Sequence, residues 1–418
     1  MLTALKGNIL EALSPDILGI HPNSYLALED GRVIGVYPAL PENMHEAVTE
    51  DYGDALILQS FTDMHLHAPQ YEFMGTGMDR PLLEWLEAYA FPTEAKYGDT
   101  AYAREQYRIL ANDLIRNGTT RVSMFSSLHT DSTVILMEEL EKAGVTGCVG
   151  KVNMDRNAPP YLCETTEESK QETLRWLEAC KRFTLVKPIL TPRFAPSCSP
   201  ELLTFLGKLK AERGLPVQSH LSENTGEIAL VAQLFTDCPQ YWEVYDKYGL
   251  FDNKTLMAHC VHSDRRERAA MAMRGVHPVH CASSNNSLMS GISPVARMLR
   301  EEQSVCLGSD VSGGTTISML RTMANSIIAA KDRGALMQDS SEAITIEQAY
   351  YMATGAGQSF LGNGIGFSEG ELLHAVVLDD TGLPNLPGIS LRERLLRAVF
   401  RLDDRHIRAV YSEGVRRR

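Results

Sequence analysis

The amino-acid sequence predicts an α/β protein, a (β/α)8 TIM barrel with a small β-sandwich domain built from both chain ends. Three observations carry this prediction. Short apolar runs alternate with helical stretches through the middle of the chain, hairpin-like patterns lie near the ends, and His or Asp residues follow several of the apolar runs. Alternating strands and helices favour a parallel sheet covered by helices, and catalytic residues then gather at the carboxyl ends of the strands.

The two ends of the chain predict the small β domain. Residues 24–28 and 33–37 are apolar-rich and flank the segment Glu29-Asp-Gly-Arg, a pattern typical of a hairpin with an Asp-Gly turn. Near the other end, the glycine-rich segment 362–366 precedes the apolar run Ala375-Val-Val-Leu. We expect residues 1–60 and 362–418 to meet in one β domain, beside a barrel formed by residues 61–361.

The middle of the chain supplies eight strand candidates, at residues 61–68, 119–126, 147–154, 187–194, 216–222, 255–261, 276–282 and 304–310. Predicted helices lie in the gaps, some opened by Thr or Ser and closed by Gly, at residues 100–117, 165–181, 200–213 and 344–353. A doubly wound sheet is the structural alternative to a barrel.

Composition narrows the class of protein. The chain has 418 residues, of which 44% are hydrophobic and 22% charged, which is ordinary for a globular protein. No apolar run reaches the roughly 18 residues of a membrane helix, and the first residues lack a secretion signal, so we expect a cytoplasmic location and no membrane partner. A net charge of −13 argues against a nucleic-acid partner. The eight cysteines are scattered singly, which predicts reduced thiols.

The stretch Phe61-Thr-Asp-Met-His-Leu-His-Ala-Pro-Gln places His65 and His67 two residues apart, so both imidazoles point to one face of a strand. Two such imidazoles make half of a zinc-type site. Three later strand ends carry further candidates, namely His220, His259 and Asp310. Parallel strand ends converge, and three imidazoles with one carboxylate can hold a single Zn²⁺ and leave room for a water of lowered pKa. The same ligands also accept Fe²⁺ or Mn²⁺.

Eight segments of the chain resemble the amidohydrolase superfamily. They are His65-Leu-His-Ala-Pro-Gln-Tyr, Pro81-Leu-Leu-Glu-Trp-Leu with Phe91-Pro-Thr-Glu, Gly150-Lys-Val-Asn-Met-Asp-Arg, Thr191-Pro-Arg-Phe-Ala-Pro-Ser-Cys-Ser, Gln218-Ser-His-Leu-Ser-Glu-Asn, Met257-Ala-His-Cys and Gly308-Ser-Asp-Val-Ser-Gly-Gly. The Pro-Arg-Phe-Ala-Pro and Ala-x-Gln segments resemble the corresponding segments of the superfamily branch that deaminates guanine. The resemblance implies a zinc hydrolase with one metal per subunit, held by His65, His67, His220 and Asp310, and a free purine base as its substrate. It also implies a homo-oligomer, expected as a dimer.

The resemblance also implies catalytic roles. Glu223 would move a proton from the water to a ring nitrogen, as a Glu that is not a ligand does in zinc base deaminases. His259 would polarise the developing tetrahedral centre, and Asp310 would serve as both ligand and proton acceptor. Glu223 has an alternative role as a cap of the helix that begins near Asn224.

By the same resemblance, Gln70, Arg193 and Phe194 would bind the purine, with Glu223 also in contact with it. Trp85 and Phe91 would help to close the pocket, although aromatic residues on helices are more often part of the core.

Two alternative functions stay open at this point, and two positions depart from the sequence pattern of the superfamily. The enzyme could act on another heterocycle, such as a pterin, an oxidised guanine or a triazine, or the chain could be a metal-binding scaffold without catalysis. Ser60 stands where the superfamily usually has glycine. His374-Ala375 stands where it usually has Ala-Asp.

Overall fold

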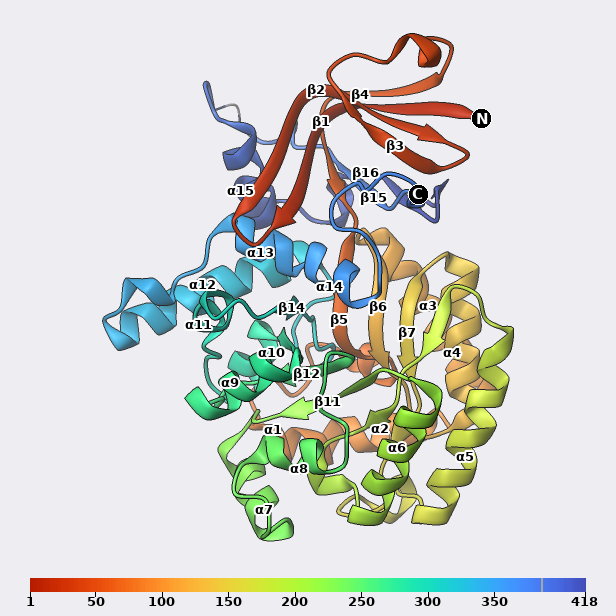
Figure 1. Ribbon diagram of the computed structural model, residues 1–418, viewed down its shortest axis with the longest axis vertical. Coiled ribbons are helices and arrows are strands. Elements are labelled where there is room, and N and C mark those ends of the chain that lie inside the picture. The colour runs from red at the N-terminus through yellow and green to blue at the C-terminus, as the bar shows by residue number, and fades with distance from the viewer. Residues whose placement is uncertain (385) are drawn as a thin grey trace.

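Strands from both ends of the chain form one seven-stranded sheet in the computed structural model, which describes residues 1–384 and 386–418 (Figure 1). The order across the sheet is β17-β16-β15-β4-β1-β2-β3. Among the described strands of this sheet, β1 and β4 pair in parallel and the other neighbours pair antiparallel. The strands are β1 (Leu2–Ser14), β2 (Ile17–Glu29), β3 (Arg32–Tyr37), β4 (Val48–Gln59), β15 (Ala375–Leu378), β16 (Ile407–Ser412) and β17 (Val415–Arg416).

This sheet confirms that the chain ends meet. β2 and β3 pair antiparallel on either side of Asp30 and Gly31, as the Asp-Gly pattern predicts. β15 joins β4 in register from Ala375 opposite Gln59. The described strands of this region belong to a single sheet, so the predicted sandwich of two sheets is not confirmed.

Two four-stranded parallel sheets lie between the chain ends, and a two-stranded pair lies with them. The first sheet contains β5 (Phe61–His67), β6 (Thr119–Phe125), β7 (Thr146–Gly150) and β9 (Val186–Pro188); the second contains β11 (Val217–Leu221), β12 (Thr255–His259), β13 (His277–His280) and β14 (Cys306–Leu307); the pair is β8 (Val152–Asn153) and β10 (Thr191–Pro192). All eight strand candidates contain strands. The third and fourth are each divided in two, and the eighth is much shorter than predicted.

The two parallel sheets approach each other at both edges. Leu190 forms an isolated parallel bridge with Val217, beside β9 and β11. At the other edge, the backbone N–H of Asp310 donates to the carbonyl of His65 over 2.8 Å. A parallel arrangement throughout brings all the carboxyl ends of the strands to one side.

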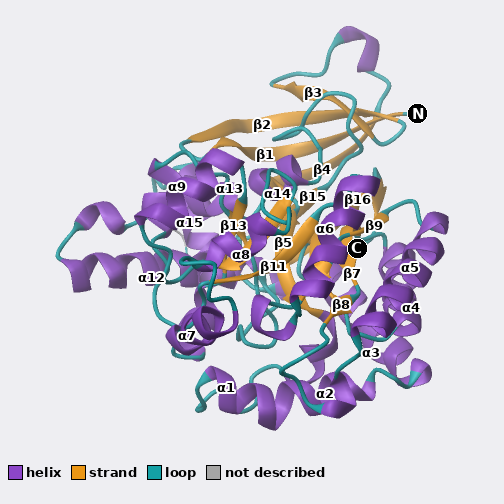
Figure 2. Cartoon of the chain, turned by 60° about the horizontal axis from the view of Figure 1, so that its bottom comes forward, coloured by secondary structure: helices purple, strands orange, loops and turns teal. Residues whose placement is uncertain are grey.

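Helices surround the parallel strands in Figure 2, whereas β1, β2 and β3 lie at the edge of the molecule. The helices are α1 (Leu82–Trp85), α2 (Phe91–Lys96), α3 (Thr100–Arg116), α4 (Thr130–Ala143), α5 (Thr166–Ala179), α6 (Pro200–Arg213), α7 (Thr225–Leu234), α8 (Tyr241–Lys247), α9 (Arg265–Arg274), α10 (Ala282–Ser287), α11 (Val295–Arg300), α12 (Met319–Met337), α13 (Ile346–Met352), α14 (Gly355–Phe360) and α15 (Leu391–Arg401).

The four helices predicted from the sequence correspond to α3, α5, α6 and α13. Their starts follow the expected capping chemistry, since the side chains of Thr165 and Ser199 accept backbone N–H bonds at the starts of α5 and α6. α6 ends at Gly214, whose φ of 64° lies in the left-handed region that glycine adopts without steric cost.

The cysteines also agree with the sequence. All eight are free and seven of them are buried, which confirms the prediction of reduced core thiols. Within residues 1–384 and 386–418, no helix combines the length and the apolar character needed to cross a bilayer.

Candidate active site

The predicted residues converge at the carboxyl ends of the parallel strands. His65 and His67 lie at the end of β5, His220 near the end of β11, His259 at the end of β12, and Asp310 three residues after β14. All five side chains are buried. They surround one end of a cavity of about 210 Å³, which is lined by four of the five together with Glu223, Gln70, Arg193 and Phe194. His65 lies beneath this lining.

Local sequence explains how Asp310 reaches the histidines. Gly308 lies so close to β5 that a Cβ there would stand 2.8 Å from the Cβ of His65, so a side chain at this position would force the strands apart. With glycine, the backbone N–H of Asp310 reaches the His65 carbonyl. The Asp310 backbone itself has a φ of 49°, a left-handed conformation that is uncommon for residues other than glycine.

The donor atoms of His65, His67, His220 and Asp310 have the spacing of a single-metal site. Asp310 Oδ1 lies 3.2 Å from His65 Nε2 and 3.6 Å from His67 Nε2, and the Nε2 atoms of His67 and His220 are 3.3 Å apart. Ligands at about 2.0–2.1 Å from a tetrahedral Zn²⁺ stand about 3.3 Å from each other. The residues therefore fit one divalent ion.

The protonation of the imidazoles agrees with a ligand role. Burial lowers the pKa of His67 and of His220 well below the ordinary value, so both rings are neutral. His220 Nδ1 lies 2.6 Å from the backbone oxygen of Arg193, which can only accept, so Nδ1 carries the proton and Nε2 offers its lone pair to the cluster.

A second trio, His65, His259 and Cys281, also has donor atoms within 4.8 Å of one another. Burial raises the pKa of the Cys281 thiol well above its ordinary value. A metal requires the thiolate, so this trio fits an ion less well than the three histidines do.

Glu223 does not cap the neighbouring helix. The capping role belongs to two other residues. The Asn224 side chain accepts the backbone N–H of Gly226 in the first turn of α7, and the Glu227 carboxylate accepts the backbone N–H groups of Glu223 and Asn224. The Glu223 carboxylate instead faces the cavity, 3.6 Å from His259 Nε2 and 3.4 Å from the hydroxyl of Ser290. Burial raises the pKa of Glu223, and His259 opposes this only in part. A carboxyl group with a raised pKa is suited to accepting and returning a proton near neutral pH.

His259 is held by a residue that the sequence did not identify. Its Nδ1 lies 2.9 Å from Oδ1 of Asn285 on α10, which orients Nε2 toward Glu223 and toward Asp310 Oδ2, at 3.8 Å. The backbone of His259 has a φ of 72°, and strained backbone of this kind is common at functional sites. Asn285 lies in the polar run Ser283-Ser-Asn-Asn directly after the seventh strand. This run is the sequence feature that could have indicated a functional residue here.

The far end of the cavity contains the residues expected to bind the purine, and a buried carboxylate connects two of them. Glu94 on α2 is 2% exposed. Both of its oxygens accept from the Arg193 guanidinium, with Nη2 to Oε1 at 2.9 Å, and Oε1 also accepts from Gln70 Nε2 at 2.8 Å. Gln70 Oε1 in turn accepts the backbone N–H of Ser312. Glu94 was part of a matching segment but was given no role from the sequence.

Aromatic and apolar side chains form the remaining wall. Trp85, Phe91 and Phe194 line the cavity with Leu82, Leu86 and Leu288. The Arg193 guanidinium carbon lies 5.4 Å from the centroid of the Phe91 ring, within the range of a cation–π contact. The cavity therefore combines a flat apolar wall with a small number of fixed polar groups, as ligand pockets generally do.

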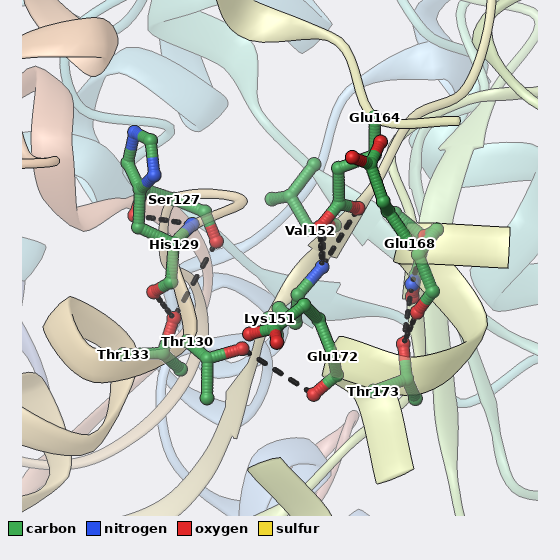
Figure 3. A network of polar contacts seen from close by, with 12 residues as sticks. Ser127, His129, Thr130, Thr133, Lys151, Val152, Glu164, Glu168, Glu172 and Thr173 are labelled. Atoms are coloured by element: carbon green, nitrogen blue, oxygen red, sulfur yellow. Dashed lines mark hydrogen bonds and ion pairs between the residues drawn. The ribbon is translucent and has the colours of Figure 1, made fainter. Parts of the chain in front are cut away.

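A polar network that includes Lys151, Val152 and Glu164 is connected to this wall through Val152 (Figure 3). The Lys151 ammonium is fully buried and lies 2.8 Å from both oxygens of Glu164, and it also donates to the carbonyl of Val152. Val152 packs in one apolar cluster with Phe91 and Phe125, and Phe125 lies against the rings of His65, His67 and His220. The ion pair fixes the loop that ends at Glu164 beneath the aromatic wall.

Comparisons with known proteins agree with this geometry. The model of the amidohydrolase family matches residues 56–416, so the chain belongs to that family. Its curated relatives include guanine deaminases. That of Dictyostelium discoideum is 34% identical over 442 aligned positions, covering 99% of this chain and 98% of the relative. That of Homo sapiens is 36% identical over 371 positions, covering 85% of this chain and 82% of the relative. The crystal structure of guanine deaminase from C. acetobutylicum, with guanine bound in the active site, superposes with a TM-score of 0.96 at 42% identity over the whole of both chains.

Proposed function

We propose that this protein hydrolyses guanine to xanthine and ammonia. The observation that carries the proposal is one cavity in which His67, His220 and His259 meet two carboxylates at one end, and an Arg–Glu–Gln cluster lies beside aromatic rings at the other. The curated relatives, which are guanine deaminases at similar length, support the same reaction.

The ligand set is assigned from the donor spacing. His65, His67, His220 and Asp310 would hold one divalent ion per subunit, which we propose to be Zn²⁺, with Fe²⁺ or Mn²⁺ as acceptable replacements because all three bind nitrogen and oxygen ligands. When bound, such an ion would lower the pKa of a water toward about 7, so that hydroxide is available at neutral pH.

The protein groups would carry the proton. Glu223 accepts a proton from the attacking water and delivers it to a ring nitrogen of guanine. The oxygen of that water forms a bond to C2, and the C2–N bond to the exocyclic amine breaks to release ammonia. His259, oriented by Asn285, stabilises the charge on the tetrahedral centre. Asp310 accepts the remaining proton of the water and passes it to the departing amine, which leaves as ammonia.

Recognition of the base is assigned to the far end of the cavity. Arg193 and Gln70 would donate to the acceptors on the edge of the purine, and Phe194 would pack on its flat face. Glu94 already occupies part of the hydrogen-bonding capacity of Arg193 and Gln70. Their remaining N–H groups therefore point in fixed directions, which favours one pattern of acceptors.

Further proposals concern the closure of the barrel, the domain bounds, the oligomeric state and the location of the protein. The approach of the two parallel sheets at both edges supports a closed barrel of eight strands within residues 61–361. We assign residues 1–60 and 362–418 to the accompanying β domain. A homodimer and a cytoplasmic location, expected from the sequence, stay predictions, and the oligomeric state is directly measurable by light scattering.

The substrate assignment is tested by ammonia release from a panel of guanine, adenine, cytosine, a pterin and 8-oxoguanine, with metal content determined on the same sample. We expect release from guanine alone, from protein holding about one metal per chain. Turnover of another base without turnover of guanine would support the assigned site but reject guanine as the substrate. Bound metal with no turnover of any base would favour a scaffold without catalysis.

A further inference from the structure

A second cavity, of about 500 Å³, opens at the amino-terminal ends of the parallel strands. Its lining includes Arg121 near the start of β6, Thr146 at the start of β7, Lys187 on β9 and Lys254 just before β12. The segment that leads into β15 closes it with Phe360, Leu361, Leu372 and His374. Because the strands run in parallel, this cavity lies at the opposite ends from the histidine cluster.

Arg121 forms the buried base of this cavity. It is 3% exposed, and its Nη1 atom has no hydrogen-bond partner among the described residues. Side chains alternate along a strand, so Arg121 lies on the same face of β6 as Ser123 and Phe125. Ser123 donates across to Gln218 on β11, and Phe125 touches the histidines. Arg121 therefore points into the space enclosed by the strands, about 13 Å along β6 from Phe125.

Three exposed cations surround the opening. Arg32, Lys187 and Lys254 donate to backbone carbonyls, those of Gly370, Phe183 and Gly214 respectively. Within residues 1–384 and 386–418, none of these three side chains, nor Arg121, lies in an ion pair. A cluster of cations without ion-pair partners is notable in a chain whose net charge is −13.

Two carboxylates also line the cavity and reduce its positive charge. Glu413 is engaged by His374 Nε2 at 2.9 Å, and Glu371 accepts from Asn363 at 3.4 Å. Burial, followed by the nearby Arg121, lowers the pKa of His374 to about 4, so this ring is neutral at pH 7. Four cations against two carboxylates leave an excess of two positive charges around the cavity.

We propose that this cavity is a second binding site, for a small dianion that bears a phosphoryl group, with Arg121 as its anchor. A buried guanidinium without a partner is costly, and phosphate oxygens are acceptors that match its planar fork. The charge excess suits a doubly charged phosphate. The apolar part of the lining, from Leu185, Phe360 and Leu361, leaves room for the carbon atoms of a phosphomonoester. The site is separate from the proposed deaminase chemistry because none of these residues lines the active-site cavity.

Binding is tested on the full-length, metal-loaded protein by calorimetric titration and thermal denaturation. The probes are inorganic phosphate and ribose 5-phosphate, each compared with KCl at the same ionic strength. We expect saturable binding and a concentration-dependent rise in Tm that KCl does not reproduce. Tighter binding of inorganic phosphate identifies the free ion as the ligand, and tighter binding of ribose 5-phosphate identifies a phosphate ester. No saturable binding of either probe overturns the proposal.

The variant Arg121→Met separates a ligand anchor from a structural residue. As an anchor, its loss should weaken phosphoryl binding at least tenfold, leave guanine turnover within about twofold, and leave the Tm without ligand unchanged or higher, since a buried unpaired charge is removed. Unchanged affinity overturns the proposal. Should this variant not fold, the double variant Lys187→Met/Lys254→Met at the exposed opening decides. Severalfold weaker binding supports the site, and unchanged binding contradicts it.

Discussion

Glu94 and Arg193 form a buried ion pair in which both carboxylate oxygens meet the guanidinium, and the same carboxylate holds Gln70. The pair joins helix α2, in the segment after β5, to the segment after β10. Two of the groups assigned to purine binding are therefore positioned by one residue that has no role in the chemistry itself.

The variant Glu94→Gln tests this positioning. The amide keeps the shape but removes the charge, so Arg193 is left without its full partner and both purine-binding groups lose their fixed orientation. We expect kcat/KM for guanine to fall about 10²-fold, mainly through a higher KM, with metal content unchanged. Glu87→Gln is the matched control, because Glu87 lines the same cavity from the exposed side and forms no ion pair among the described residues. Unchanged kinetics, or loss of metal together with activity, would contradict the role of Glu94.

The variant Glu223→Gln tests the proton transfer. Glutamine keeps the volume of the side chain but cannot accept a proton, so kcat should fall by about 10²–10⁴-fold while the metal stays bound. Steady-state kinetics with metal analysis of the same preparation measure both quantities. Glu243→Gln, a substitution in the first turn of α8, should leave both unchanged. Near-normal turnover in the Glu223 variant would remove this residue from the mechanism.

The variants His65→Ala and His67→Ala test the ligand set. Each removes one of the three imidazoles whose nitrogen atoms converge, so the metal should be lost together with the activity. His129→Asn is the control, since His129 lies outside the active-site cavity. Elemental analysis after dialysis is the measurement. One metal per chain in either alanine variant would show that the ion, if present, is held elsewhere.

Much of this site follows from the sequence because its parts are local. The sequence shows a pair of imidazoles two residues apart and single His or Asp residues after apolar runs. The rule that parallel strand ends converge was enough to predict that these residues cluster. Glu94 and Asn285 were missed because their partners lie far away in sequence, and the placement of α2 and α10 depends on loops whose path no local pattern specifies.

The two departures from the family pattern show the same limit. Ser60 and His374 are distant in sequence, but both contact the hydroxyl of Thr120. The Ser60 hydroxyl and His374 Nδ1 each form a hydrogen bond with it, so the two unusual residues belong to one buried chain of hydrogen bonds. Each substitution alone looked unexplained. The register that brings β15 beside β4 makes them compatible, and register between chain ends is a tertiary property.

His374 also predicts how stability depends on pH. Burial, aided by Arg121, lowers the pKa of this ring to about 4, whereas the unfolded chain has the ordinary value near 6.5. Between these values the unfolded state binds the extra proton, so stability is fully present above about pH 6.5 and falls by about 3 kcal/mol as the pH drops to about 4. Denaturant unfolding of the protein and of His374→Gln at several pH values measures this. The advantage of the native residue should shrink across that window, and a constant difference would contradict the assignment.

The most direct test of the account is guanine turnover by protein stripped of metal and then reconstituted. We predict no conversion by the stripped protein, and full activity after about one equivalent of Zn²⁺, with xanthine and ammonia formed in equal amounts. Guanine turnover that persists without metal, or a fully reconstituted protein that leaves guanine unchanged, would contradict the central claim.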